Sequence, residues 1–461
     1  MTTFLHEGIT PLRCLLLWLE NAMFTLQFVA AVLLFLSNQN AVSFKETPQA
    51  DDCLKIELSL SLKGEMKVQR DRKMVAIPMV AIANHHFEER IIHLSSTGIP
   101  DKVARNYSKA DALFNIEGNK SERTLRKQRS LIVAQRPENS IFVYSPKGPL
   151  TREELELTGE HFDTLSLANL IPDKGPIPTE AWKLKDFTVQ AICNFEGLSE
   201  HTLTGKVVSN ENGIVTFKIE GTATGVESGA SVTSTVNATG TWTEKAAKIT
   251  NLNWKQSDNR EAGPVNPASK TEMEIIIKRE VLETPQTLND AALVSIPQDF
   301  DVPNLMTYVE FKDQQGRFDL SMSRDWQLVA KTENHLVLRL VEKGDFIAQA
   351  TVSVWSKAEP GKHLSVAEFK TITERTPGWV VEKDLQEGEV PSGDKGRWVY
   401  RISALGQLDN VPTMQNYYVV TSPGGEQVVV TFSLSPKQAE KLGTKDLSLI
   451  GSLELPGTAG K

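Results

Sequence analysis

The stretch LKIELSLSL, residues 54–62, decides the fold of the first half of the chain. Its apolar side chains stand at every second position, and mostly polar ones stand between them. Successive side chains of a strand point to opposite faces, so this alternation predicts a half-buried β-strand. The same alternation returns at residues 215–220, after a turn-forming Asn-Glu-Asn-Gly, and at 250–254. The short connections between such segments predict an antiparallel meander over residues 54–281.

One helical segment interrupts these strands, LTREELELTGEHFDTLSLANLIP at residues 150–172. Thr151 and Glu154 have the spacing of a capping box, and Gly159 is a typical helix end. The helical insertion divides the strands into two groups, residues 54–148 and 180–281. A sheet with so many strands must curl, so we expect a curved antiparallel sheet with a helical cover. The concave face is expected to form an apolar ligand groove lined by Leu58, Leu60, Phe217 and Ile219.

A curved sheet wrapped around helices resembles the half-barrel of bacterial lipoprotein-carrier and related lipid-binding proteins. The resemblance implies an apolar ligand on the concave face. If helix side chains fill this face only in part, the domain is expected to be a carrier. If they fill it completely, it is expected to be a structural scaffold.

A second unit follows a proline-punctuated segment. Pro285, Pro297 and Pro303 interrupt the pattern after residue 281, which indicates a domain boundary. We therefore expect a β-rich domain at residues 45–283, a linker at 284–303 and a second domain at 304–461.

The second domain alternates strands with well-marked helices. Residues 316–326 are expected to form a hairpin, and the next hairpin turns at Lys343-Gly344. Ser365 and Glu368 have capping-box spacing at a helix start. Three further strands precede a helix that begins at Ser435-Pro436 and a last helix, DLSLIGSL. The pattern predicts an antiparallel sheet flanked by helices, and the whole chain is therefore expected to be an α+β protein.

This C-terminal third resembles the PsbP-like family. The resemblance rests on Gly-Arg-Phe-Asp-Leu at residues 316–320, on Trp326, on the aromatic pair Tyr417-Tyr418 and on the terminal hairpin and helix. It implies a central antiparallel sheet between helices and an accessory role. It implies no metal ligand.

The N-terminus carries a targeting signal. Residues 12–36 are mostly apolar, but Glu20 and Asn21 interrupt them. The second run, residues 22–36, is shorter than the roughly 20 residues that span a membrane, and Ala-Val-Ser at 41–43 fits cleavage after Ser43. Residues 1–43 are therefore expected to be a signal peptide, with an uncleaved anchor at 12–36 or a buried helix as alternatives. The chain as a whole resembles exported bacterial proteins, so an extracytoplasmic (periplasmic or secreted) location follows.

Three cysteines are present, of which Cys14 lies in the targeting segment. In an oxidising compartment Cys53 and Cys193 can pair as a disulfide. Two buried free thiols are the alternative, because spacing alone does not fix disulfide geometry.

Charge and motifs exclude several function classes. Acidic residues outnumber basic ones, 58 to 50, which disfavours nucleic-acid binding. The chain contains no P-loop, no Gly-x-Gly-x-x-Gly and no Cys-x-x-Cys. His85 and His93 would stand roughly 26 Å apart on one strand, too far to share a metal. We therefore expect no catalytic, cofactor-binding or metal-binding residues. The basic segment KSERTLRKQR, residues 120–129, is expected to be a charged sheet edge or a patch for an acidic partner or lipid headgroup.

The sequence thus predicts an exported, non-enzymatic protein that binds a partner or an apolar ligand through its β-rich domain. The partner is expected to be a protein or a lipid, with membrane attachment through the N-terminus. The alternatives are a purely structural envelope component and a hydrolase with a dispersed site near Glu160 and His161.

Overall fold

The computed structural model describes residues 43–70, 73–137, 141–159, 162–173, 175–227, 229–263, 267–342, 345–392 and 396–456. The segment up to residue 42 that is expected to be a targeting signal, the pair Glu160 and His161, and the expected turn at Lys343-Gly344 lie outside the described residues. No helix among the described residues has both the length and the apolar character needed to cross a bilayer.

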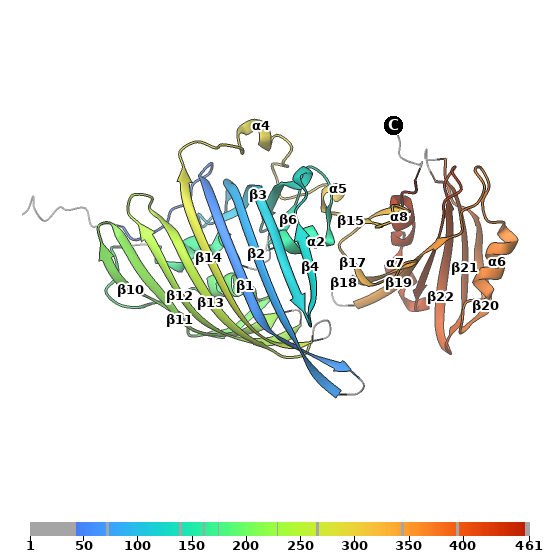
Figure 1. Ribbon diagram of the computed structural model, residues 1–461, viewed down its shortest axis with the longest axis horizontal. Coiled ribbons are helices and arrows are strands. Elements are labelled where there is room, and N and C mark those ends of the chain that lie inside the picture. Colours follow the sequence, from blue (N-terminus) through green and yellow to red (C-terminus); the bar gives the residue numbers. More distant parts are fainter. Residues whose placement is uncertain are drawn as a thin grey trace, which may run out of the picture.

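The first part of the chain forms a 13-stranded antiparallel sheet, as the alternation predicts (Figure 1). In order across the sheet its strands are β6 (Phe142–Tyr144), β5 (Leu131–Gln135), β3 (Pro100–Ile116), β2 (Lys73–Leu94), β1 (Cys53–Arg70), β14 (Ala268–Leu282), β13 (Lys248–Arg260), β12 (Ala230–Thr243), β11 (Ile214–Glu227), β10 (Thr204–Glu211) and β8 (Trp182–Lys183), while β4 (Asn119–Thr124) pairs with β3 and β9 (Gly197–His201) with β11. β1 lies in the middle and pairs with β14 from Cys53↔Leu282 to Lys67↔Ala268. The first and last strands of the unit therefore hold its two halves together.

Short helices cover one face of this sheet: α2 (Arg152–Thr158), η2 (Thr164–Leu170) and α3 (Asp186–Ile192). The capping box is confirmed, because Thr151 Oγ1 accepts from the backbone N–H of Glu154, whose carboxylate accepts from the N–H of Thr151. The inward side chains of the alternating strands form one core with these helices. Alternation thus separates a buried face from an outer face.

The described chain begins inside this core. Phe44 is fully buried and makes edge-to-face contacts with Trp182, Phe217 and Trp242. Its backbone N–H donates to the carbonyl of Gly175 over 3.2 Å. Cleavage after Ser43 would place the charged α-amino group at this buried position, where desolvation is costly.

Cys53 and Cys193 are buried free thiols, so the predicted disulfide between them is wrong. Cys53 begins β1, and its Sγ donates to Glu88 Oε1 over 3.2 Å. Cys193 follows the last turn of α3 and lies in the core among other apolar side chains. Burial raises the pKa of both thiols, that of Cys53 to about 12, so neither is a ready nucleophile.

Residues 284–303, expected as a linker, lie against the large sheet and include α4 (Asp290–Leu293). The Glu88 carboxylate accepts from the backbone N–H groups of Gln286, Thr287 and Leu288 over 2.7–3.3 Å. Leu288 and other apolar side chains of the segment pack against β3, β5 and β6 in a separate cluster. The segment is therefore docked rather than extended between two bodies.

Lys102 holds the other end of this segment. Its side chain is buried, and Nζ donates to the carbonyls of Pro297, over 2.7 Å, and Asp299. Burial lowers the pKa of the Lys102 ammonium. Two charged groups on neighbouring strands thus fix the segment at both ends.

Glu88→Gln is expected to release the docked segment. Hydrogen bonds to a charged acceptor contribute about 1.5–3 kcal/mol each, so the local opening free energy of residues 286–288 should fall by about that amount. Amide hydrogen exchange measures it, and Glu57→Gln on the exposed face of β1 is the control. Unchanged exchange at residues 286–288 in the Glu88 variant would contradict the assignment.

The docking is also expected to depend on pH. Burial alone would raise the pKa of the Glu88 carboxyl, but hydrogen bonds from Thr287, Cys53 and Leu288 lower it below its ordinary value. The stabilisation is therefore complete above the ordinary carboxyl pKa of about 4.3 and is lost as the pH falls below it. Exchange of residues 286–288 should accelerate selectively in that acidic range.

A small three-stranded sheet joins the first unit to the rest of the chain. Its strands are β16 (Asp319–Met322), β15 (Val309–Lys312) and β7 (Leu150–Thr151), with β15 parallel to β7. Arg126 bridges the joint, because it pairs with Glu154 over 2.6 Å and with Glu310 over 2.7 Å. α5 (Asn304–Thr307) precedes β15.

The C-terminal part is a seven-stranded antiparallel sheet with helices on both faces. In order its strands are β17 (Trp326–Lys331), β18 (His335–Glu342), β19 (Asp345–Trp355), β23 (Gln427–Leu434), β22 (Val411–Thr421), β21 (Trp398–Leu408) and β20 (Trp379–Glu389). Phe369 of α6 (Val366–Glu374) packs on one face with Tyr400 and Tyr417. The other face carries η3 (Pro436–Gln438), α7 (Ala439–Leu442) and α8 (Lys445–Ser452).

Most local signals in this part are confirmed. Ser365 and Glu368 form the capping box of α6, and Gly443 ends α7 with a positive φ of 53°. The expected hairpin at residues 316–326 is wrong, because β16 pairs with β15 whereas Trp326 begins β17 of the seven-stranded sheet. The polar turn between them moves the chain from one sheet to the other.

Candidate functional site

The predicted concave groove is filled, which corrects the expectation for Leu58, Leu60, Phe217 and Ile219. All four side chains are buried, Phe217 and Ile219 fully. Phe217 contacts the rings of Phe44 and Trp182, so the N-terminal segment occupies the space beside it. Among the described residues, side chains of the helices and of the N-terminal segment therefore fill this part of the inner face.

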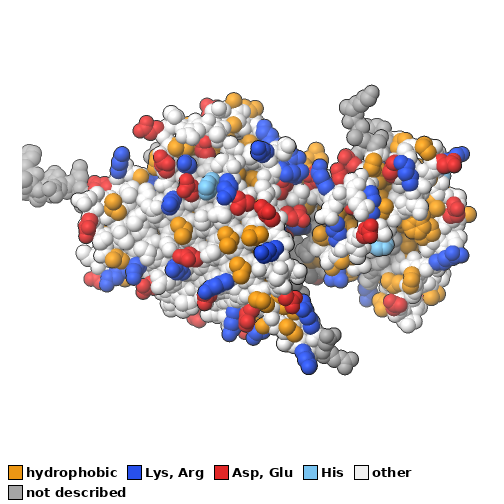
Figure 2. Space-filling model, in the orientation of Figure 1, with side chains coloured by type: hydrophobic (Ala, Val, Ile, Leu, Met, Phe, Trp, Pro, Cys, Tyr) orange, Lys and Arg blue, Asp and Glu red, His pale blue; other side chains and the backbone are white. Residues whose placement is uncertain are grey.

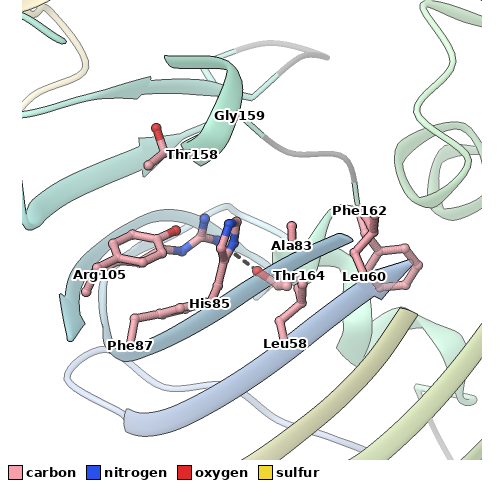
Figure 3. Close-up of a pocket in the computed structure, with 11 residues that line it drawn as sticks. Leu58, Leu60, Ala83, His85, Phe87, Arg105, Thr158, Gly159, Phe162 and Thr164 are labelled. Carbon is pink, nitrogen blue, oxygen red and sulfur yellow. Dashed lines mark hydrogen bonds between the residues drawn. The ribbon is translucent and has the colours of Figure 1, made fainter. Parts of the chain in front are cut away.

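A small cavity remains beside Leu58 and Leu60 (Figure 3). Its volume is about 30 Å³, enough for only a few water molecules. The residues that line it are Leu58, Leu60, Ala83, His85, Phe87, Arg105, Tyr107, Thr158, Gly159, Phe162 and Thr164. A space of this size excludes an alkyl chain or a substrate.

The charge on the cavity wall is already neutralised. Arg105 is 2% exposed, pairs with Glu89 over 2.8 Å and donates to Thr164 Oγ1 over 2.8 Å. Its guanidinium also lies over the ring of Phe87, 5.3 Å from the centroid. A buried charge with these contacts supports the fold and does not offer a free charge to a ligand.

A larger groove lies across the outer face, over five neighbouring strands from β2 to β12. Its volume is about 590 Å³, within the range of small-molecule sites. The residues that line it are Ser61, Leu62, Lys63, Val80, Ala81, Ile82, Thr235, Asn237, Lys255, Gln256, Ser257, Glu272, Met273 and Glu274. Val80 and Ile82 are 44% and 47% exposed there.

Ion pairs neutralise the charges of this outer groove. Lys63 pairs with Glu272 over 2.8 Å, and Lys255 pairs with Glu274 over 3.4 Å. The pairing raises the pKa of Lys63 and lowers that of Glu272. Equal numbers of positive and negative side chains around apolar ones suit a neutral, apolar or amphipathic ligand.

The sequence contains a signal for this outer groove that a search for alternating strands does not detect. Residues 74–83 read MVAIPMVAIA, so the apolar residues continue on both faces of β2. A strand with one solvated face normally alternates. An uninterrupted apolar run in such a strand therefore indicates an exposed apolar stripe.

His93 and two arginines of the basic segment pair with carboxylates within the chain. No group of three His, Cys, Asp or Glu residues there could hold a metal ion. His93 Nδ1 lies 2.7 Å from the Asp101 carboxylate, at the end of β2 away from His85. In the basic segment, Arg123 pairs with Glu156, and Arg126 belongs to the joint described above.

Comparisons with known proteins give structural neighbours only. No family model matches the chain, and no curated protein matches it. The cyanobacterial PsbP protein (CyanoP) of Synechocystis is 11% identical, with a TM-score of 0.25 over 32% of this chain and 92% of its own. The Ran-binding protein Mog1p of Saccharomyces cerevisiae is 9% identical, with a TM-score of 0.24 over 32% of this chain and 95% of its own.

Lipovitellin is a neighbour over a different extent of the chain. It is 8% identical, with a TM-score of 0.31 over 52% of this chain, and the match spans 26% of lipovitellin. PsbP is thus among the similar structures, whereas the expected likeness to lipoprotein carriers is not shown. At such TM-scores the likenesses carry no argument about ligand, partner or activity.

Proposed function

We propose that this chain is an exported, non-enzymatic binding protein that takes a neutral apolar ligand, such as an acyl chain, in the outer groove of its large sheet. The observation that carries the proposal is the contrast between the two faces. The inner face keeps a cavity of about 30 Å³, whereas the outer groove of about 590 Å³ has exposed apolar side chains and paired charges. The apolar N-terminal segment supports an extracytoplasmic location.

The C-terminal part fits the role of a PsbP-like accessory domain. Its seven-stranded sheet lies between α6 on one face and α7 and α8 on the other. The parallel pair β7–β15 and the bridging Arg126 attach it to the first unit near α2. This arrangement supports an accessory domain held at a defined place beside the ligand-binding unit.

Titration of the full chain with a fluorescent fatty-acyl probe tests the proposal. We expect saturable binding that Ile82→Asp weakens at least about tenfold, because a charge in an apolar site costs more than about 1.4 kcal/mol. Ile82 is 47% exposed, so the substitution should leave the fold intact.

Ile214→Asp is the matched control. Ile214 is 46% exposed on β11 of the same sheet but does not line the outer groove. Its variant should bind the probe like the unmodified chain. Equal loss in both variants, or no saturable binding by the unmodified chain, would contradict the proposal and favour a structural component.

A further inference from the structure

The β1–β2 hairpin projects beyond the sheet that it belongs to. β14 pairs with β1 only as far as Lys67, and β3 pairs with β2 only as far as Met79. The strand ends beyond these residues therefore pair only with each other, from Val68↔Val75 to Arg70↔Lys73. Figure 1 shows this hairpin as a projection below the rest of the sheet.

An apolar stripe follows one face of the projecting strand. Alternation places Met74, Ala76, Pro78, Val80 and Ile82 of β2 on the outer face, and all five are exposed. Met74 is 63% exposed. Leu113 of β3, directly opposite Ile82, extends the stripe at 46% exposed.

Basic side chains flank this apolar stripe. Lys67 lies on the same face as the stripe, opposite Ala76, whereas Lys73 at the tip alternates to the other face of the hairpin. Described residues 67–70 and 73 include three basic residues, Lys67, Arg70 and Lys73, and no acidic one, and Arg70 pairs with Glu117 over 2.7 Å. The whole chain has a net charge of −8, so the projection is a local exception. Figure 2 shows hydrophobic and basic side chains mixed on it.

We propose that the projecting hairpin docks onto an anionic lipid surface, with Met74 and its neighbours in the interface and Lys67 and Lys73 at the headgroups. Apolar side chains with a basic rim are the combination that such surfaces select. Two copies of the stripe packed on each other would bring like charges together. A projection, unlike a groove, also presents its side chains to a flat partner. This inference rests on the end of the hairpin, with Met74, Ala76 and Pro78, which do not line the outer groove, so it does not depend on a ligand there.

An environment-sensitive fluorophore on Met74→Cys, in the full chain with Cys14→Ser, tests the proposal locally. Cys53 and Cys193 are buried and should not label. We expect a blue shift with vesicles of phosphatidylcholine and phosphatidylserine in equal amounts, and a much smaller one with phosphatidylcholine alone. Lys67→Gln with Lys73→Gln should weaken the titration about 25-fold, from about fivefold per lysine.

Lys206→Gln with Lys218→Gln is the matched control. These exposed lysines face each other on β10 and β11, away from the hairpin, and their loss should leave the titration unchanged. An equal shift with both vesicle types, or none with either, would overturn the proposal. A shift with poly-glutamate but not with vesicles would also overturn it and would identify an acidic polypeptide as the partner.

Discussion

Glu46→Leu is expected to destabilise the first unit by about 3–5 kcal/mol, because it leaves Arg279 buried without its ion-pair partner. The two side chains are 1% and 8% exposed and pair over 2.6 Å. Burial opposes the charge of Arg279, yet Glu46 raises the pKa of the guanidinium. Glu46 also accepts from the backbone N–H of Ile249 over 3.0 Å, so the pair ties the N-terminal segment to β13 and β14.

A double variant distinguishes the effect of the ion pair from the effect of the side-chain volume that the two residues fill. Glu46→Leu with Arg279→Met removes both charges and should recover most of the lost free energy of unfolding, because apolar replacements of a buried pair are often neutral. Urea denaturation of the full chain compares Glu46→Leu, Arg279→Met and the double variant. Glu272→Leu, which breaks an exposed pair, is the control and should leave the midpoint unchanged. A double variant as unstable as the two single losses added together would contradict the account.

Trp326→Ala is expected to cost the C-terminal part about 3–5 kcal/mol. Trp326 is 2% exposed, meets the ring of Phe432 edge-on at 5.9 Å and belongs to the core shared with β18 and β19. Its carbonyl accepts from Arg152 of α2 over 3.0 Å, so the residue also stands at the joint between the two parts. Removal of the indole should leave a cavity that the surrounding sheet cannot close.

Leu328→Ala on the same strand is the control. Leu328 is 37% exposed, and its loss should change the free energy of unfolding by only about 0.5 kcal/mol. Urea denaturation followed by circular dichroism compares the two. A Trp326 variant that loses less than about 1 kcal/mol would contradict burial and make a binding role for this side chain plausible.

Local sequence patterns predicted where the strands and helices of this fold lie better than they predicted which strands pair with each other. Alternation located strands such as β1 and β11, and the spacing of Thr151–Glu154 and Ser365–Glu368 located two helix starts. Each of these signals depends on neighbours within a few residues. The move from β16 to β17 between two sheets depends on long-range pairing, which no local pattern encodes.

The filling of the inner face could not be predicted for a related reason. Alternation identified Phe217 and Ile219 as inward, but only the tertiary structure shows that Phe44 and Trp182 fill the space beside Phe217. Docking of residues 284–303 likewise depends on Glu88 and Lys102, which are charged residues in strands where the pattern predicts surface. The apolar run in β2 was the one local signal for the outer groove.

Native mass spectrometry of the chain purified from its own host tests the central claim most directly. A neutral lipid should remain bound to the unmodified chain, and to the Ile214→Asp variant, and should be absent from the Ile82→Asp variant. A chain that carries no ligand in any variant, or one whose ligand survives Ile82→Asp, would contradict the assignment of the outer groove as the binding site.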